Sequence, residues 1–174
     1  GLGQAARHGI LLKNAAVLDQ ASQLQLLAFD KTGTLTQGQP QISARQSFTA
    51  QPEAELFSIA CALQQHSEHP LAKAFRLDAS ATLPVITGFQ VIAGVGVAAT
   101  LSSNDQRWQL GSAQLVQAAG LTLPADLQSH DGSQVFLIQL DPQPQLVAVF
   151  WLQDQIRPDS AAAVQLLQAQ GYQL

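Results

Sequence analysis

Short apolar and polar stretches at the start of the chain predict an α/β arrangement. Leu24–Phe29 is an apolar run with a single glutamine, and it stops abruptly at Asp30, where a polar, glycine-containing loop over residues 31–38 follows. A continuous apolar run that ends at a polar loop is typical of a buried parallel strand. Upstream of this run, Gly3–Gly9 predicts the end of a short helix, and Asn14 predicts the cap of a second one.

The pattern changes after Gly38-Gln39-Pro40, which predicts a break in the chain. Helical spacing over Glu53–Gln65 predicts a helix, and Ser67 predicts the cap of another helix with Pro70 in its first turn. Alternating or apolar runs bounded by turn residues predict the remaining elements. These are strands at 42–48, 85–92, 97–101, 107–110, 134–140 and 145–152, the last two forming a hairpin, and a short helix at 112–119.

The end of the chain returns to an α/β pattern. Asp159–Gln170 is amphipathic and stops at Gly171, and residues 172–174 look like the first residues of a further strand. We therefore expect an antiparallel sheet flanked by helices over 41–150, inserted between two parts of one α/β domain at 1–40 and 151–174. This organisation, together with the first residue being glycine, suggests a piece of a longer protein.

Composition narrows the class of protein. The 174 residues carry 8 Lys+Arg against 12 Asp+Glu, a net charge of −4, which argues against nucleic acid as a partner. Charged residues make up only 11%, and 27 glutamines spread along the chain supply much of its polarity. Cys61 is the single cysteine, so no disulfide within the chain is possible. No apolar run reaches the roughly 18 residues that a membrane span needs.

The strongest chemical signal is the run Asp30-Lys31-Thr32-Gly33-Thr34-Leu35-Thr36. A carboxylate at the end of a strand can attack a phosphorus atom, and Gly33 lets the backbone turn so that N–H groups face phosphate oxygens. Thr32 and Thr34 add hydroxyl donors, and Lys31 can offset developing negative charge. The run therefore predicts a phosphoryl-transfer site, whereas an ordinary surface turn is the alternative.

A second group of signals lies in the middle segment. His69 in Ser67-Glu68-His69-Pro70 could be a structural residue at a helix start, and His66 with His69 could be a metal pair, although no third ligand is near in sequence. Gly94-Val95-Gly96 by itself predicts no more than a bulge or a hairpin. Gly111-Ser112 is a similarly weak signal.

Taken together, these motifs resemble those of heavy-metal-transporting P-type ATPases, a branch of the haloacid dehalogenase-like superfamily. The run from Asp30 resembles their phosphorylation motif, and the segment around His69 resembles the signature of their nucleotide-binding domain. The resemblance implies that ATP phosphorylates Asp30, with Mg²⁺ held by Asp30 and the backbone carbonyl of Thr32. It also implies an adenine site made by His69 and its neighbours, namely Glu68, Gly94, Gly96, Gly111 and Ser112.

Three positions differ from related patterns. Many phosphatases of this superfamily carry a second aspartate where Thr32 stands, and its absence favours a long-lived phosphoenzyme. Gln64 stands where the pumps tend to have glutamate, so that an amide replaces a charge in the adenine site. Ser112 stands where asparagine is usual. We count Gln64 as a candidate nucleotide-binding residue.

The expected function is the ATP-binding and phosphorylation part of a heavy-metal-exporting pump, with Cu(I) as the favoured cargo. The expected partners are ATP or ADP and the rest of the parent pump. The parent is expected in a bacterial inner or plasma membrane, and this piece would belong to its cytoplasmic part. The loops that complete the catalytic site are missing, so we expect little or no turnover. A free-standing phosphohydrolase with a large cap and a non-catalytic nucleotide-binding module are the alternatives.

Overall fold

The computed structural model describes residues 2–11, 14, 16–21, 23–76 and 82–174. The chain divides into two compact units. The inserted unit is Gly38–Gln155, and the split unit combines Gly1–Gln37 with Ile156–Leu174. Among the described residues, no helix combines the length and the apolar character that crossing a membrane requires.

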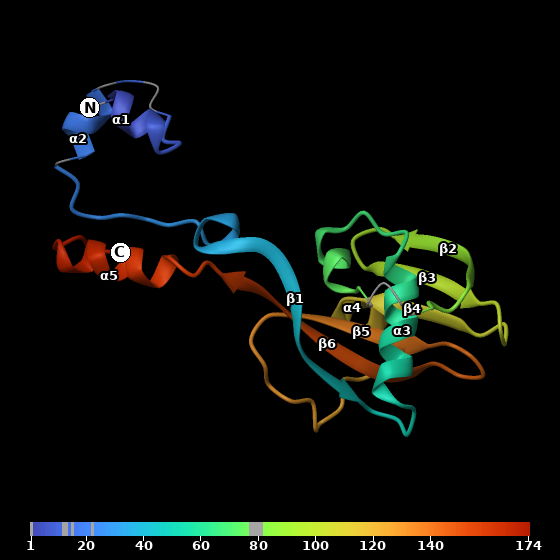
Figure 1. Ribbon diagram of the computed structural model, residues 1–174. Coiled ribbons are helices and arrows are strands. Elements are labelled where there is room, and N and C mark those ends of the chain that lie inside the picture. The colour runs from blue at the N-terminus through green and yellow to red at the C-terminus, as the bar shows by residue number, and fades with distance from the viewer. Residues whose placement is uncertain (1, 12–13, 15, 22, 77–81) are drawn as a thin grey trace. The chain divides into compact units, whose positions relative to one another are not determined.

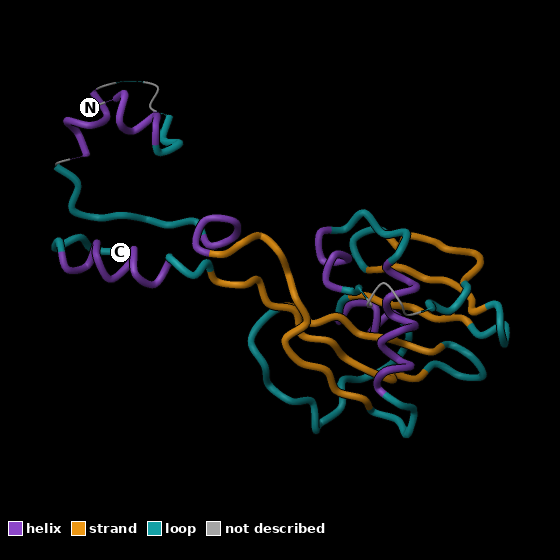
Figure 2. Tube along the Cα trace, in the orientation of Figure 1, coloured by secondary structure: helices purple, strands orange, loops and turns teal. Residues whose placement is uncertain are grey.

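A six-stranded sheet forms the inserted unit, with strand order β1-β6-β5-β4-β3-β2 (Figures 1 and 2). Each pairing from β2 through to β6 is antiparallel. The strands are β1 (Thr36–Ser47), β2 (Ile86–Ile92), β3 (Gly96–Leu101), β4 (Arg107–Gly111), β5 (Ser133–Gln139) and β6 (Gln145–Ile156). The helices are α3 (Glu53–Gln64), α4 (Ala113–Ala118) and a 3₁₀ turn at Pro70–Ala74. The predicted antiparallel sheet flanked by helices is thus confirmed.

Apolar cores cover both faces of this sheet. Along β5, Val135 and Leu137 belong to the core beneath α3, whereas Phe136 and Ile138 belong to the core beneath α4. Successive strand residues point to opposite faces, so a strand buried on both faces must be apolar at every position. The uninterrupted apolar runs of β5 and β6 follow from this requirement.

The predicted chain break at Gly38-Gln39-Pro40 is wrong, because these residues lie inside β1. The Asp154 carboxylate accepts hydrogen bonds from the N–H groups of Gly38 (3.1 Å) and Gln39 (2.9 Å). Since β1 is at the edge of the sheet, Pro40 is tolerated there without a backbone donor. A side chain of the neighbouring strand β6 therefore accepts these two hydrogen bonds in place of backbone carbonyls.

The split unit contains the helices α1 (Leu2–Arg7), α2 (Ala16–Ala21) and α5 (Ser160–Ala169). The cap predicted at Asn14 is confirmed, since its Oδ1 accepts a hydrogen bond from the N–H of Ala16 at 3.0 Å. The predicted central strand Leu24–Phe29 is wrong: it forms one isolated parallel bridge, between Leu26 and Gln173. In the described residues only this short segment pairs with it, and a single bridge does not make a strand.

Candidate functional site

The loop that follows Asp30 is a tight turn with an exposed carboxylate at its start. Asp30 has extended backbone angles and its side chain makes no capping hydrogen bond. The turn over Lys31–Leu35 departs from helical geometry at Thr32 and at Gly33, which has a φ of +80°. A positive φ strains residues that carry a Cβ atom, which explains the glycine. Lys31, Thr32 and Thr34 are all exposed beside the carboxylate.

The buried side chain of Thr36 holds this loop through two hydrogen bonds. Its side chain is 2% exposed, and its hydroxyl oxygen accepts a hydrogen bond from the N–H of Gly33 at 3.1 Å. The same hydroxyl donates to the backbone carbonyl of Lys31 at 3.1 Å. The last threonine of the motif therefore fixes the backbone around the first five residues.

Two residues from the far end of the chain also hold the loop. The Arg157 guanidinium donates to the carbonyls of Thr36 (3.1 Å) and Gly33 (3.2 Å). The Ser160 hydroxyl, in a residue only 8% exposed, donates to the carbonyl of Leu35 at 2.8 Å. Sequence reasoning missed both residues, because they lie more than 120 positions from the loop and nothing in their local pattern marks the contact.

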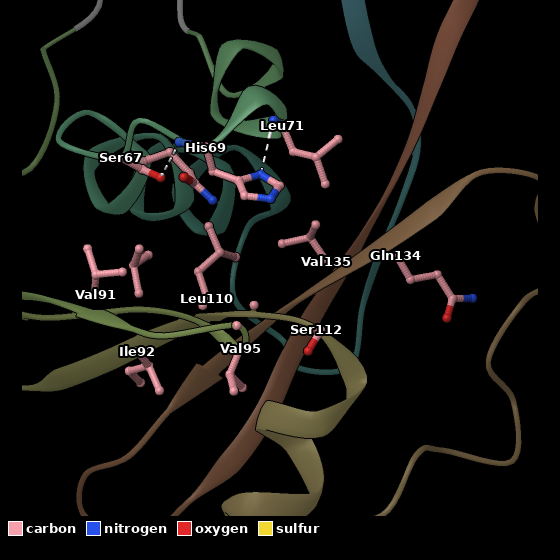
Figure 3. Close-up of a pocket in the computed structure, with 15 residues that line it drawn as sticks. Ser67, His69, Leu71, Val91, Ile92, Val95, Leu110, Ser112, Gln134 and Val135 are labelled. Carbon is pink, nitrogen blue, oxygen red and sulfur yellow. Dashed lines mark hydrogen bonds between the residues drawn. The ribbon is translucent and has the colours of Figure 1, made fainter. Parts of the chain in front are cut away.

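A cavity of about 280 Å³ opens on the inserted unit (Figure 3). It gathers six of the seven residues proposed from the sequence to bind nucleotide: Gln64, His69, Gly94, Gly96, Gly111 and Ser112. Glu68 is exposed and does not line the cavity. The lining also includes residues that the sequence did not single out as site residues, namely Ser67, Leu71, Val91, Ile92, Val95, Val97, Leu110, Gln134 and Val135.

His69 is fixed at the edge of this cavity by hydrogen bonds with its own turn (Figure 3). Its Nδ1 accepts a hydrogen bond from the N–H of Leu71 at 3.2 Å, so that His69 caps the 3₁₀ turn. Its N–H donates to the Ser67 hydroxyl oxygen at 3.3 Å. The prediction that Ser67 caps this turn is therefore wrong. In the neutral ring this bond leaves the proton on Nε2, which is then a donor.

The three glycines of the cavity are required for different reasons. Gly94 has a φ of +71° in the turn between β2 and β3, with open space where a Cβ would lie. Gly96 and Gly111 are paired across β3 and β4. A Cβ on Gly96 would approach the carbonyl oxygen of Leu110 to 2.3 Å, and one on Gly111 would approach that of Val95 to 2.2 Å. Strand pairing alone therefore excludes side chains at both positions.

Two polar atoms at the cavity lack hydrogen-bond partners. Gln64 Oε1 and Ser112 Oγ are buried and unpaired within the described part of the chain. An unpaired buried polar atom costs about 1–3 kcal/mol, so neither side chain is fully satisfied by the described protein groups around it. These are two of the positions where the sequence departs from the pattern it resembles.

Cys61, on α3, is free and buried. Burial raises the pKa of its thiol to about 12, although the charge of Arg45 acts in the opposite direction. The thiol therefore stays protonated at neutral pH and acts as a small packing residue.

Comparisons with known proteins agree on one class. A family model described as haloacid dehalogenase-like hydrolase matches residues 24–174. The chain is 38% identical over 172 residues to "Probable copper-transporting ATPase SynA" of Synechococcus sp., covering 97% of this chain and 21% of that protein. It is 35% identical over 175 residues to "Zinc/cadmium/lead-transporting P-type ATPase" of Escherichia coli, covering 98% of this chain and 23% of that protein.

Among solved structures, the chain resembles a zinc-transporting PIB-type ATPase crystallised in an E2.Pi state. The TM-score is 0.74 at 30% sequence identity, covering 99% of this chain and 28% of that one. The chain spans 21% to 28% of the length of these relatives.

Proposed function

Because the chain belongs to the haloacid dehalogenase-like hydrolase family, we propose that it forms the ATP-binding and phosphorylation part of a heavy-metal-exporting P-type ATPase. The observation that carries the proposal is the uncharged cavity beside His69, which occurs in the same chain as the exposed Asp30 carboxylate. Neither feature alone distinguishes a pump from other members of the family. Together they supply a nucleotide site and a phosphoryl acceptor.

In the proposed reaction, an Asp30 carboxylate oxygen attacks the γ-phosphorus of ATP. The bond from that phosphorus to the β–γ bridging oxygen breaks, ADP leaves with the electron pair, and Asp30 becomes an acyl phosphate. The Lys31 ammonium offsets negative charge on the transferring group, and the hydroxyls of Thr32 and Thr34 donate to its oxygens. Water later attacks the acyl phosphate and releases inorganic phosphate.

Thr32 makes that last step slow. A threonine hydroxyl cannot act as a general base near neutral pH, so no carboxylate at this position activates the attacking water. A long-lived phosphoenzyme suits a pump, because the intermediate must survive a change of conformation. The same residue argues against the alternative of a free-standing phosphohydrolase.

The cavity suits the base of the nucleotide and not its phosphates. At about 280 Å³ it is close to the lower end of ligand-pocket volumes, roughly 300–1,000 Å³, and none of the described residues that line it is Asp, Glu, Lys or Arg. His69 Nε2 can donate to the base, while Gly94 and Gly96 keep the turn between β2 and β3 free of bulk. We assign Glu68 to shaping the loop, since it does not line the cavity.

Mg²⁺ would be held at the phosphorylation loop. The Asp30 carboxylate and the Thr32 carbonyl offer oxygen ligands of the kind Mg²⁺ prefers, and phosphate oxygens and water commonly complete its coordination. Among the described residues, no group of three or more acidic, histidine or cysteine side chains could hold a metal ion. When bound, Mg²⁺ neutralises charge on the phosphates.

We propose that residues 41–150 form the nucleotide-binding domain and that 1–40 and 151–174 belong to the phosphorylation domain. The inserted unit found in the structure, Gly38–Gln155, lies within a few residues of these bounds. The parent would place both domains on the cytoplasmic side of a bacterial membrane, with the rest of the pump as partner. We propose Cu(I) as cargo, in keeping with the copper-transporting relative, although another relative transports zinc, cadmium and lead.

The proposal is tested by titrating ¹⁵N-labelled chain with ATP and following amide shifts by NMR. We expect saturable shifts around Gly94 and Gly96 at millimolar ATP, and their loss in His69→Ala. His8→Ala is the matched control, because His8 is an exposed histidine of the split unit. An absence of shifts in the unaltered chain contradicts the nucleotide site, and rapid ATP or phosphomonoester hydrolysis supports a phosphohydrolase instead.

A further inference from the structure

The polar groups of the cavity have an unusual property in common: none of them carries a fixed charge. They are Gln64, Ser67, His69, Ser112 and Gln134. A carboxylate only accepts hydrogen bonds and an ammonium only donates them, whereas amides and hydroxyls do both. A base bound here therefore meets groups that can adapt to it.

The Gln64 side chain is the least constrained of these groups. Its Oε1 is buried without a partner, and no hydrogen bond to other described residues fixes the amide in one orientation. Exchanging the oxygen and nitrogen of an amide requires only a half-turn of its last torsion angle. The amide can therefore present either a carbonyl oxygen or an NH₂ group to a ligand at no cost in broken bonds.

From this we infer that the cavity accepts purine bases with either an amino or an oxo group at position 6, so that the chain binds purine nucleoside triphosphates as a class. Gln64 Oε1 accepts from the 6-amino group of adenine, and its NH₂ donates to the 6-oxo group of hypoxanthine or guanine. This inference rests on the proposed nucleotide-binding function and specifies its substrate class.

Ser112 imposes no contrary preference, whereas His69 presents a donor in a fixed position. Ser112 Oγ is also buried and unpaired, and its hydroxyl can donate or accept by rotating. Only His69 is fixed, because its Nδ1 is occupied by the N–H of Leu71. Sites discriminate strongly between ligands when a wrong one leaves a buried polar group unpaired, and neither Gln64 nor Ser112 imposes that penalty here.

The test is calorimetric titration of the chain with ATP, ITP and GTP at pH 8, where a carboxyl introduced by mutation is ionised. ITP carries a 6-oxo group and a proton on N1 where ATP carries a 6-amino group and a bare N1, and it lacks the 2-amino group of GTP, so it tests this edge of the base apart from the bulk of that group. We expect dissociation constants for ATP and ITP within about threefold of each other, with GTP near them.

Gln64→Glu should create a preference that the unaltered chain lacks. A carboxylate can accept from the 6-amino group but cannot donate to a 6-oxo group, so ITP and GTP should weaken by about tenfold or more while ATP binding is retained. Gln65→Glu introduces the same charge at the next position, which is exposed and outside the cavity. It should leave the ratio of ATP to ITP binding unchanged.

The outcomes separate the inference from the function on which it rests. No detectable ATP binding contradicts the proposed function. ATP binding with ITP more than tenfold weaker leaves that function standing and contradicts the inference, as does a Gln64→Glu chain whose ratio stays near one. An HSQC spectrum checks the fold of the variant, and Gln64→Leu should weaken all three nucleotides by a similar factor.

Discussion

The two units of this chain are stabilised in different ways. All buried apolar side chains of the described residues lie between Leu56 and Leu152, in the inserted unit. In the described part of the split unit the buried residues are polar, Thr36 and Ser160. Eight large apolar side chains in that part are exposed: Ile10, Leu11, Leu24, Leu26, Phe29, Ile156, Leu166 and Leu174.

The two candidate sites therefore depend on different interactions, apolar packing for the cavity and hydrogen bonds for the loop after Asp30. The cavity is built on strands packed between two apolar cores, so its geometry follows from burial. The loop after Asp30 is shaped by hydrogen bonds from Thr36, Arg157 and Ser160.

The largest expected effect is a difference in the free energy of unfolding between the same substitution made in each of the two units. Leu137→Ala removes a side chain that is 0% exposed and should lower the free energy of unfolding by about 2–5 kcal/mol. Leu166→Ala removes one that is 60% exposed and should change it by no more than about 0.5 kcal/mol. Urea unfolding followed by tryptophan fluorescence and circular dichroism measures both.

Tryptophan fluorescence reports selectively here, because Trp108 and Trp151 are the only two tryptophans and both lie in the inserted unit. A similar loss of stability in Leu137→Ala and Leu166→Ala would contradict the division, since it would show that the two units share one cooperative core.

The next effect compares two glycines that the motifs require for different reasons. Gly96→Ala forces a Cβ to within 2.3 Å of the Leu110 carbonyl oxygen and should destabilise the inserted unit by about 1–3 kcal/mol. Gly33→Ala strains a residue with a φ of +80° but meets no neighbouring atom. Its effect should stay within the loop and leave the tryptophan-detected midpoint unchanged. An equal fall in both midpoints would show that the loop is coupled to the sheet.

The sequence was informative where burial sets the pattern. The helix at Glu53–Gln64 and the hairpin of β5 and β6 were predicted because their apolar residues recur with a clear period or fill a whole strand. The prediction failed at Leu24–Phe29, which has the composition of a central strand but only a single bridging partner. Strand formation depends on neighbours that lie elsewhere in the chain, and the composition of one segment does not reveal them.

The site was predictable in its residue types and less so in its supports. Motif spacing placed His69 and the glycines in the same region, and the structure brings them to one cavity. Motif spacing did not indicate Leu71, Val91 or Leu110, since apolar residues that line a cavity have the same sequence pattern as core residues. Arg157 was also missed as a support, because its contacts with the loop depend on the return of the chain after more than a hundred residues.

A smaller effect should follow from loosening the phosphorylation loop. Arg157→Ala removes two hydrogen bonds to the carbonyls of Thr36 and Gly33, each worth about 0.5–1.5 kcal/mol. We expect amide hydrogen exchange over residues 32–36 to accelerate by about tenfold, with no change in the tryptophan-detected midpoint. Arg7→Ala, at an exposed arginine of α1 in the same unit, is the control and should leave that exchange unaltered. Unchanged exchange in Arg157→Ala would mean that Thr36 and Ser160 suffice.

The smallest effect concerns acid stability of the inserted unit, where charge contributes little beside the apolar cores. The Asp141 carboxylate accepts hydrogen bonds from the Arg107 side chain at 2.8 and 3.0 Å and from its backbone N–H at 2.9 Å. These bonds lower the pKa of Asp141 from 3.8 to about 2. Because the folded state holds this proton more weakly than the unfolded state, the contribution is fully present above about pH 4 and disappears as the pH falls through 2.

Asp141→Asn should therefore lower the urea midpoint slightly at pH 5 and much less at pH 2, whereas Asp126→Asn, at an exposed aspartate of the same unit, should show no such difference. The side chains of Arg107 and Asp141 are both accessible to solvent, so salt should screen their interaction. The effect of Asp141→Asn at pH 5 should therefore decrease in 1 M NaCl. A large fall in the midpoint of the unaltered chain between pH 5 and pH 3 would mean that charged groups stabilise the inserted unit more than its apolar cores suggest. Apolar packing would then not be what distinguishes the inserted unit from the split unit.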